Sequence, residues 1–474
     1  LILCILMVSH FNIAIINVSR DSVRIDGVSF TQSKVCVFVA PDSSFAGIRK
    51  ILDSANKTLK IMVYEFWSPD IKEKIIDALN RGVKIYLLVE GETYGTEGNY
   101  WNRDTLSELY ELNRTQNKPI WIRLENTDRY LHAKVIIADG SMVFVSSENF
   151  MPTSYPPKPN AIELTPYDRP SRGWGTIIKN PAIAGVYEGF FDSIFFSDAL
   201  SREYNPEEYR EAPERDGIKV FRPIASIKEF NAYVYPVFSP DNSFDTIKWM
   251  ISRANYTIYL SLMYIVSDSN VVDQLIDELV KARNKGVTIH IILEDDFAGY
   301  YGDIVPRLRS HGFHVVPAFS QDEILFLHNK GIIVDDVLVL IGSINWSGKA
   351  LSENWEAGIL IKSREVALYY KRIYEYDWNK SSTKPFDGDN DGLSDYYEEE
   401  HGYNPNNPDT DGDGIDDWEE VFIYNNKYGG YKPRSRMTSW IILTVIVIVV
   451  IIVMVVYISK RRKHNTNNKG LTNL

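Results

Sequence analysis

The sequence predicts an α/β protein with two similar lobes, each a mixed sheet flanked by helices, related by a pseudo-twofold axis. Three observations predict this fold. Apolar, β-branched runs alternate with amphipathic segments, as strands and helices do in an α/β sheet. The order of these segments occurs twice along the 474 residues. A short polar motif ends each copy, and a repeat on this scale indicates two domains and not a solenoid.

The first half contains three predicted strands and two predicted helices. The strands cover residues 35–39, 59–66 and 83–89, and the helices cover residues 45–56 and 71–81. Gly82 follows the second helix, where a glycine commonly ends a helix. These elements predict a strand, helix, strand, helix, strand order before the first motif.

The second half repeats this order after Tyr235-Pro236-Val237-Phe238. A strand over residues 257–264 matches the one at 59–66, a helix covers 271–284, and Gly286 precedes a strand at 287–293. Each motif then adjoins an apolar run of the kind expected for a buried strand, at residues 135–138 and 331–334.

The two motifs carry the residues expected to do chemistry. Each reads H-x-K, four residues, D, six residues, a small residue and S-x-N. Residues i and i+2 of a strand face the same side, so each histidine should project beside its lysine. Histidine is a nucleophile or general acid near neutral pH, and lysine offers a positive charge for a phosphate oxygen. The first motif contains His132, Lys134, Asp139, Ser147 and Asn149, and the second His328, Lys330, Asp335, Ser343 and Asn345.

This doubled pattern resembles the HKD motif of the phospholipase D superfamily, over residues 37–377. The resemblance implies two phospholipase D-like lobes with one site at their interface. It implies ping-pong chemistry, with His132 as the nucleophile that forms a phosphohistidine and His328 as the acid/base. Lys134, Lys330, Asn149 and Asn345 would bind the non-bridging oxygens, with Ser147 and Ser343 as supporting donors. Asp139 and Asp335 would hold local structure, and the chemistry would require no metal.

The resemblance also assigns a glutamate to each histidine, and here the halves differ. It implies that Glu356 orients His328. In the first half, Gly173 occupies the place where the matching glutamate would be, and Ser146 replaces the usual glycine. Glu163 and Asp139 are the candidate replacements, between which spacing does not decide. The two histidines are therefore expected to be inequivalent, and the choice of nucleophile stays open.

The net charge of −12 comes from one segment near the C-terminus. Residues 387–420 hold 14 acidic residues and no lysine or arginine, and the rest of the chain holds 51 basic against 49 acidic residues. The lobes are thus near neutral, unlike a typical duplex-binding protein. This balance weakens a nuclease interpretation without excluding it. Of two cysteines, Cys4 and Cys36, the first lies in a segment expected to be removed, so no intrachain disulfide is expected.

The acidic segment has the spacing of two calcium loops of the EF-hand type, 22 residues apart, each with glycine at position 6. They are too close together for full flanking helices and resemble the short repeats of thrombospondin type 3 or dockerin modules. Affinities on the order of 0.1–1 mM would suit extracellular Ca²⁺ as a structural ion. A solvated acidic linker is the alternative. The expected ligands are Asp387, Asp389, Asp391, Leu393, Asp395 and Glu398, then Asp409, Asp411, Asp413, Ile415, Asp417 and Glu420.

Two apolar segments predict export and anchoring. Residues 440–458 contain no charge and are long enough to span a bilayer, and Lys460-Arg461-Arg462-Lys463 marks the cytoplasmic side. Residues 1–28 resemble a secretory signal, with an N-terminal anchor as the alternative. The expected division is a signal-like segment at 1–28, lobes at 29–215 and 216–384, calcium-binding repeats at 385–424, a juxtamembrane linker at 425–439, a transmembrane helix at 440–458 and a cytoplasmic tail at 459–474.

The sequence therefore predicts a membrane-anchored phosphodiesterase with its catalytic region outside the cell. A phospholipid is the leading substrate, hydrolysed or transphosphatidylated. A surface endonuclease acting on DNA and a non-catalytic, calcium-stiffened surface protein are the alternatives. Oligomeric state and signal cleavage site are left undetermined.

Overall fold

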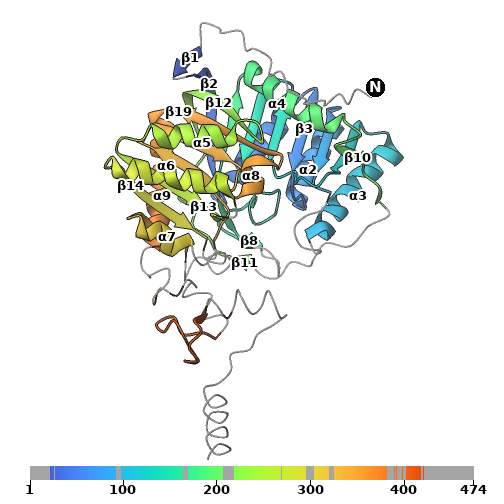
Figure 1. Cartoon of the computed structure of the whole chain (residues 1–474). Coiled ribbons are helices and arrows are strands. Elements are labelled where there is room, and N and C mark those ends of the chain that lie inside the picture. Colours follow the sequence, from blue (N-terminus) through green and yellow to red (C-terminus); the bar gives the residue numbers. More distant parts are fainter. Residues whose placement is uncertain are drawn as a thin grey trace, which may run out of the picture. The chain divides into compact units, whose positions relative to one another are not determined.

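A computed structural model gives the fold of the chain (Figure 1). It describes residues 22–25, 27–91, 98–163, 169–206, 218–267, 269–294, 304–319 and 325–381, and then 389, 391, 398, 402–417 and 420. The chain divides into two compact units, residues 1–386 and 387–474. The predicted transmembrane segment lies outside the described residues, and so do residues 1–21 and 26 of the predicted signal-like segment, whereas its residues 22–25, 27 and 28 are described. Among the described helices, none is long and apolar enough to cross a membrane.

The first unit contains two copies of one sheet pattern. In the first half, β5 (Ile120–Glu125), β4 (Lys84–Val89) and β3 (Thr58–Val63) run parallel, and antiparallel pairings then add β6 (Val135–Ala138), β7 (Met142–Ser146), β9 (Ser171–Lys179) and β2 (Val28–Ala40). In the second half, β15 (His314–Pro317), β14 (Thr288–Leu293), β13 (Thr257–Leu262), β17 (Lys330–Val334), β18 (Leu338–Gly342), β19 (Glu356–Lys362) and β12 (Lys228–Ser239) follow the same order. The predicted mixed sheets and duplication are confirmed.

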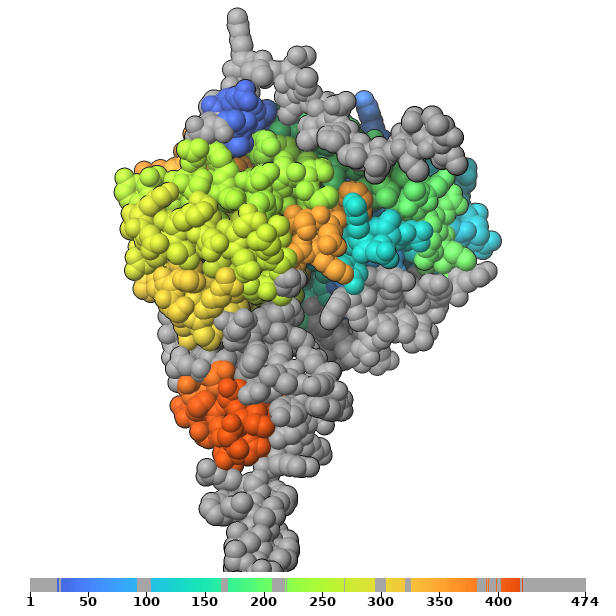
Figure 2. Space-filling view, in the orientation of Figure 1, coloured from blue at the N-terminus to red at the C-terminus, as the bar shows by residue number. Residues whose placement is uncertain are grey.

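One antiparallel pair joins the two copies into a continuous sheet. Strands β2 and β12 pair from Thr31↔Val234 to Val37↔Lys228. Because this pair lies midway between the two copies, each strand on one side has its counterpart at the same step on the other side. In Figure 2 the yellow-green surface of the second half lies beside the cyan and green surface of the first, and the orange surface around α8 (Gly348–Ser352) adjoins both. The remaining strands are short: β1 (Ser22–Ile25), β8 (Ile162–Glu163), β10 (Ser201–Glu203), β11 (Ile218–Lys219) and β16 (Phe326–Leu327).

Helices cover both faces of this sheet. One face carries α1 (Ser44–Ser54), α2 (Pro69–Asn80) and α3 (Gly98–Gln116) over the first half, and α5 (Ser243–Ser252), α6 (Asn270–Asn284), α7 (Ile304–Ser310) and α8 (Gly348–Ser352) over the second. The other face carries α4 (Pro181–Phe195) and α9 (Arg364–Ser381), whose apolar residues form a core shared by both halves. The two halves are therefore packed as one body.

Local sequence explains where these helices begin and end. The Ser68 hydroxyl accepts a hydrogen bond from Ile71 N before α2, and Pro69 takes the first helical position, where a missing N–H costs nothing. Gly82 and Gly286 end α2 and α6 with φ of +86° and +97°, which favours glycine. The predicted helix ends at both glycines are confirmed.

A buried ion-pair cluster connects the halves next to β9. The Arg172 guanidinium donates to Asp42, in the turn after β2, and to Asp377 on α9 at 3.1 Å. All three side chains are at most 1% exposed, so the arginine has no access to water. Since Asp377 belongs to the second half, this cluster fixes α9 against β9 of the first.

Replacing Arg172 by methionine should destabilise the fold strongly. The change leaves two carboxylates buried without their cation, and removal of one partner of a buried pair typically costs about 3–5 kcal/mol. The urea midpoint of the full chain, followed by tryptophan fluorescence, should fall markedly. Arg49→Met is the matched control, because Arg49 and Asp53 form an exposed pair with side chains 60% and 45% exposed. Equal midpoints for the two variants would contradict this account.

Candidate active site

The two motif histidines lie at the junction of the halves, and each is held by the opposite half. His132 N donates to the Trp355 carbonyl of the second half at 2.9 Å, and His328 N donates to the Arg172 carbonyl of the first half at 3.1 Å. The residue before each histidine also pairs in parallel with the opposite half: Leu131 with Trp355, and Leu327 with Arg172. Neither half alone therefore positions its own histidine.

The carboxylates that orient the histidines differ from those expected. His132 Nδ1 lies 2.9 Å from Glu356 Oε2 and 3.1 Å from the Ser343 carbonyl. The prediction that Glu356 orients His328 is wrong, because the pairing of Leu131 with Trp355 at the junction of the halves places the next residue, Glu356, beside His132. His328 Nδ1 lies 3.5 Å from Glu148 Oε1 instead. A carboxylate at Nδ1 favours the tautomer with the proton there, leaving the Nε2 lone pair for chemistry.

Glu148 occupies the space that the missing glutamate would need. The register of β7 with β9 places Gly173 opposite the same motif step as Glu356 in the second half. A Cβ at Gly173 would meet Glu148 Oε1 at 1.8 Å. Ser147 contacts Glu148 at 3.1 Å, and Ser343 donates to Glu356 in the same way. The acid has thus moved from β9 into the S-x-N segment, where the second half has Ile344.

The other candidate replacements lie elsewhere. Asp139 accepts backbone N–H groups of residues 56–58 at 2.8–2.9 Å, and Asp335 does the same for residues 255–257 at 2.7–2.9 Å. Both aspartates thus hold turns at the ends of β3 and β13, away from the histidines. Glu163 lies on β8, paired with Ile218 of β11. Ser147 and Ser343, expected as supporting donors, bind the two glutamates.

The motif lysines lie beneath the histidines and are buried. Lys134 Nζ donates to the His132 carbonyl, and Lys330 Nζ to the His328 carbonyl, each at 2.6 Å. Burial lowers the pKa of Lys134 to about 7, against the attraction of Glu356, Glu65, Glu148 and Glu90. Burial and repulsion by Lys134 lower the pKa of Lys330 well below its ordinary value. The two lysines repel each other when both are protonated. A bound anion would offset this repulsion and favour the protonated form of both.

Burial and the two neighbouring lysines favour the neutral form of both imidazoles. Burial, with repulsion by Lys134 and Lys330, lowers the pKa of His132 well below 6.5, and burial with the same lysines lowers that of His328 to about 4. Because both lysines act on both rings, the four groups converge on one site. Burial raises the pKa of Glu356 to about 7, whereas His328 and Lys330 outweigh burial at Glu148 and lower its pKa to about 2.

Two further glutamates, absent from the sequence prediction, align the histidine segments. Glu90 accepts a hydrogen bond from Leu131 N, and Glu294 accepts one from Leu327 N. Each glutamate is buried and immediately follows a strand, β4 or β14. An acid directly after the same predicted strand in both halves is the signal that could have identified them.

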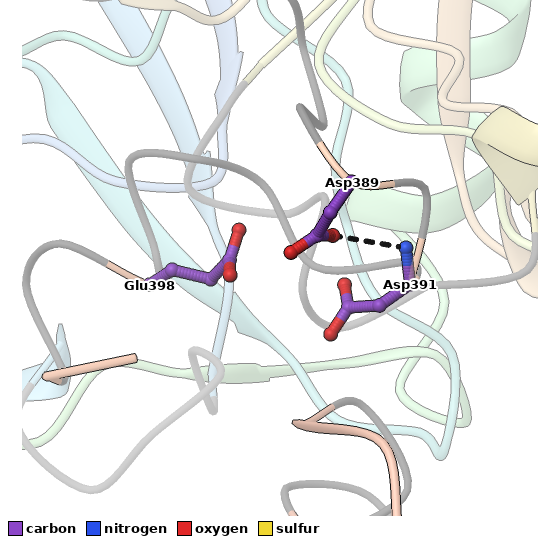
Figure 3. A group of neighbouring side chains, drawn as sticks. All are labelled: Asp389, Asp391 and Glu398. Carbon is purple, nitrogen blue, oxygen red and sulfur yellow. Dashed lines mark hydrogen bonds between the residues drawn. The ribbon is translucent and has the colours of Figure 1, made fainter. Parts of the chain in front are cut away.

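The second unit contains two groups of acidic side chains. Asp389, Asp391 and Glu398 form one group (Figure 3). Asp409, Asp411 and Asp413 form the other, and in each group the carboxylate oxygens lie within 4.8 Å of one another. Asp413 N donates to Asp411 Oδ1 at 3.0 Å, Gly414 N to Asp409 Oδ2 at 2.9 Å, and Gly414 has φ +94°. Asp417 instead accepts from Thr410 N at 2.8 Å. Ile415 N donates to Asp413, Glu420 is buried, and Asp387, Leu393 and Asp395 lie outside the described residues.

Comparison with known families identifies the first unit. Residues 48–194 and 247–378, more than half of the chain, match the family described as "Cardiolipin synthase, PLD-like domain". The chain belongs to this PLD-like family. It is an enzyme that acts on phosphodiester bonds, and the resemblance inferred from the doubled motif is confirmed. Residues 387–408 and 409–423 match the bacterial TSP3 repeat, which confirms the resemblance to thrombospondin type 3 modules.

Individual relatives of this PLD-like chain are distant. Cardiolipin synthase A of Wigglesworthia glossinidia brevipalpis is 21% identical over 390 residues, covering 77% of this chain and 72% of that protein. The mitochondrial cardiolipin hydrolase of Xenopus tropicalis is 24% identical over 152 residues, covering 32% and 69%. The fold is similar to that of phosphatidylserine synthase from Haemophilus influenzae, with a TM-score of 0.53 at 14% identity, covering 73% of this chain and 85% of that one.

Moving the glutamate from residue 148 to residue 173 should restore the activity that the loss of Glu148 alone removes. Glu148→Ile alone leaves His328 without its carboxylate, and loss of such an orienting partner typically lowers activity about 10–100-fold. Gly173→Glu alone crowds Glu148. The double variant recreates the arrangement of the second half, with Ile and Glu at the two steps, and should recover most of the activity. Turnover of a chromogenic phosphodiester measures all three.

Ile344→Val is the control for this experiment, because it changes packing at the matched step of the second half without touching a carboxylate. Additive losses in the Glu148→Ile, Gly173→Glu double variant would show that Glu148 does not serve as the displaced glutamate.

Proposed function

We propose that this protein is a phospholipase D-type enzyme whose substrate is a phospholipid, hydrolysed or transphosphatidylated through a phosphohistidine. One observation carries the proposal: two histidines, each with a carboxylate at Nδ1, lie at the junction of the halves with two buried lysines. This arrangement supplies a nucleophile, an acid and two cations around a single phosphodiester. The names of the relatives, cardiolipin synthase and cardiolipin hydrolase, support a lipid substrate.

In the first step, His132 Nε2 attacks phosphorus while the bond from phosphorus to the leaving oxygen breaks. His132 is the proposed nucleophile because its ring has the shorter carboxylate contact, 2.9 Å against 3.5 Å at His328. Glu356 fixes this ring and offsets the positive charge that it gains. His328, protonated when the anionic substrate binds, gives its proton to the leaving oxygen.

In the second step, neutral His328 removes a proton from water or an alcohol, whose oxygen attacks phosphorus. The phosphorus–nitrogen bond breaks and His132 is released. Water gives hydrolysis, and an alcohol gives transfer. Lys134 and Lys330, with Asn149 and Asn345, stabilise the charge on the non-bridging oxygens in both steps.

We also propose that the TSP3 repeats bind Ca²⁺ and act as a spacer outside the catalytic unit. The two acidic groups fit a hard cation, because carboxylate oxygens are its preferred ligands and the Asp-rich turns already gather them. The apolar residues 440–458 would then anchor the chain in a cell membrane with its lobes outside. The charge pattern of the sequence supports this orientation.

Both histidines should be needed for release of headgroup from phospholipid vesicles. His132→Ala and His328→Ala should each lower turnover at least 10³-fold, since each removes a group that touches the reacting atoms. Acid-sensitive phosphohistidine should be detected by mass spectrometry at His132 in the wild type after rapid quenching and be absent from His132→Ala. Label at His328 would reverse the assignment of nucleophile.

The alternatives have distinct outcomes in the same assay with EDTA present. Cleavage of single-stranded DNA, stronger at low salt and without lipid turnover, would indicate a nuclease. No turnover of lipid, DNA or a chromogenic diester would indicate a non-catalytic scaffold. Lys371→Gln is a matched control, because Lys371 pairs with Asp336 away from the histidines.

Removing calcium should loosen the repeats and leave catalysis intact. EDTA should make residues 387–423 sensitive to a Glu-specific protease, because 14 acidic residues then repel one another without a cation. Headgroup release should change less than twofold. Asp409→Asn with Asp411→Asn should give the same proteolysis pattern in calcium. Unchanged proteolysis on chelation would contradict a bound structural ion.

A further inference from the structure

The histidines and lysines of the site occur in both halves, but the residues beside them differ. We call the segment Tyr64-Glu65 of the first half, with its counterpart Met263-Tyr264 of the second, the wall of the site. Parallel bridges pair Phe66 with Phe150 and Ile265 with Trp346, which fixes the correspondence of the segments after β3 and β13. By this register Glu65 lies beside Asn149, and Tyr264 takes the same position beside Asn345. A phosphodiester has two different substituents, so a site must use its unduplicated residues to distinguish them.

Glu65 is the acidic member of this asymmetric wall. Its Oε2 accepts a hydrogen bond from Asn149 Nδ2 at 2.7 Å, and its carbonyl accepts one from Phe150 N at 2.9 Å. Lys134 lies close enough for its charge to act on the carboxyl group. Unlike Glu148 and Glu356, which are at most 1% exposed, Glu65 is only partly buried. It therefore faces the catalytic groups and remains accessible.

The residue before Glu65 makes the same wall polar on one side of the site. The Tyr64 ring packs edge-on against His132 at 5.2 Å, and Lys134 Nζ lies 5.4 Å from its centroid. The matching residue of the second half, Met263, contacts Lys330 Nζ through its sulfur at 3.6 Å. One side of the site thus presents a phenol and a carboxyl group, whereas the corresponding segment opposite presents a thioether and a phenol and no carboxyl group.

We infer that Glu65 forms a headgroup subsite that selects a substituent carrying hydrogen-bond donors, above all a primary ammonium. A carboxylate accepts several such bonds and attracts a cation, and it disfavours a second anionic group. The diacylglycerol substituent offers no donor, so this wall distinguishes the two ends of the lipid. Burial raises the pKa of Glu65 to about 7, and an ammonium ligand would keep the group ionised. This inference rests on the proposed phospholipid activity.

The decisive variant is Glu65→Gln. Its amide oxygen can still accept the hydrogen bond from Asn149, so Asn149 keeps its place while the negative charge is lost. Mixed vesicles with equal fractions of phosphatidylethanolamine and phosphatidylglycerol provide competing headgroups. The full-length wild type should release ethanolamine in preference to glycerol, and Glu65→Gln should lower this ratio of kcat/KM values about tenfold.

Two further variants keep the result interpretable. Glu65→Asp retains the charge and should keep ethanolamine preferred, and Tyr264→Phe changes the matched position of the second half and should leave the ratio as in the wild type. A ratio within twofold of wild type in Glu65→Gln, or an equal fall in both rates, would overturn the subsite and leave Glu65 as a support for Asn149. No headgroup release by the wild type would instead overturn the proposed function, and the subsite with it.

Discussion

The site depends on one constraint: each half of the chain holds the histidine of the other half in place. The backbone N–H of His132 donates to the carbonyl of Trp355, directly before β19. The backbone N–H of His328 donates to the carbonyl of Arg172 in β9. Each ring then meets a carboxylate from the half opposite to its own. A site built this way exists only when both halves are folded and packed. The shared core under α4 and α9 and the buried Arg172 cluster serve that requirement, because both fix one half against the other.

Charge balance is the second constraint. Two lysines and two histidines are buried together, a costly arrangement for isolated cations. Carboxylates offset this cost: Glu148 and Glu356 at the rings, Glu90 and Glu294 at the chain segments before them, and Glu65 on one side. The histidines respond by remaining neutral, and the lysines by losing affinity for their protons. An anionic phosphodiester would reverse both tendencies, so in the proposed mechanism the binding of substrate would favour protonation of the acid.

Duplication followed by local divergence explains the asymmetry of the site. The sheet order, the motif lysines and the two turn-holding aspartates are the same in both halves. The position of the orienting acid is not the same, because Glu148 with Gly173 replaces Ile344 with Glu356. In each half, one member of the pair is a glutamate whose carboxylate fills the space beside the histidine of the opposite half. The glutamate can therefore lie at either chain position and still contact Nδ1 of that histidine. The halves also differ at Glu65, which accepts a hydrogen bond from Asn149, whereas Tyr264 occupies the matching position in the second half.

The sequence by itself determined the duplicated α/β architecture and the helix ends at Gly82 and Gly286, and it singled out the histidines and lysines of the candidate site. Periodicity, turn chemistry and motif spacing are local properties, so they can be derived from the order of residues. Only the tertiary structure decided which glutamate serves which histidine. That pairing depends on contacts between the halves, such as Leu131 beside Trp355 and Leu327 beside Arg172, which join residues far apart in sequence. Glu148 was not predicted for the same reason. Its contact with His328 requires the space that a side chain at Gly173 would fill, and only the folded chain shows that space.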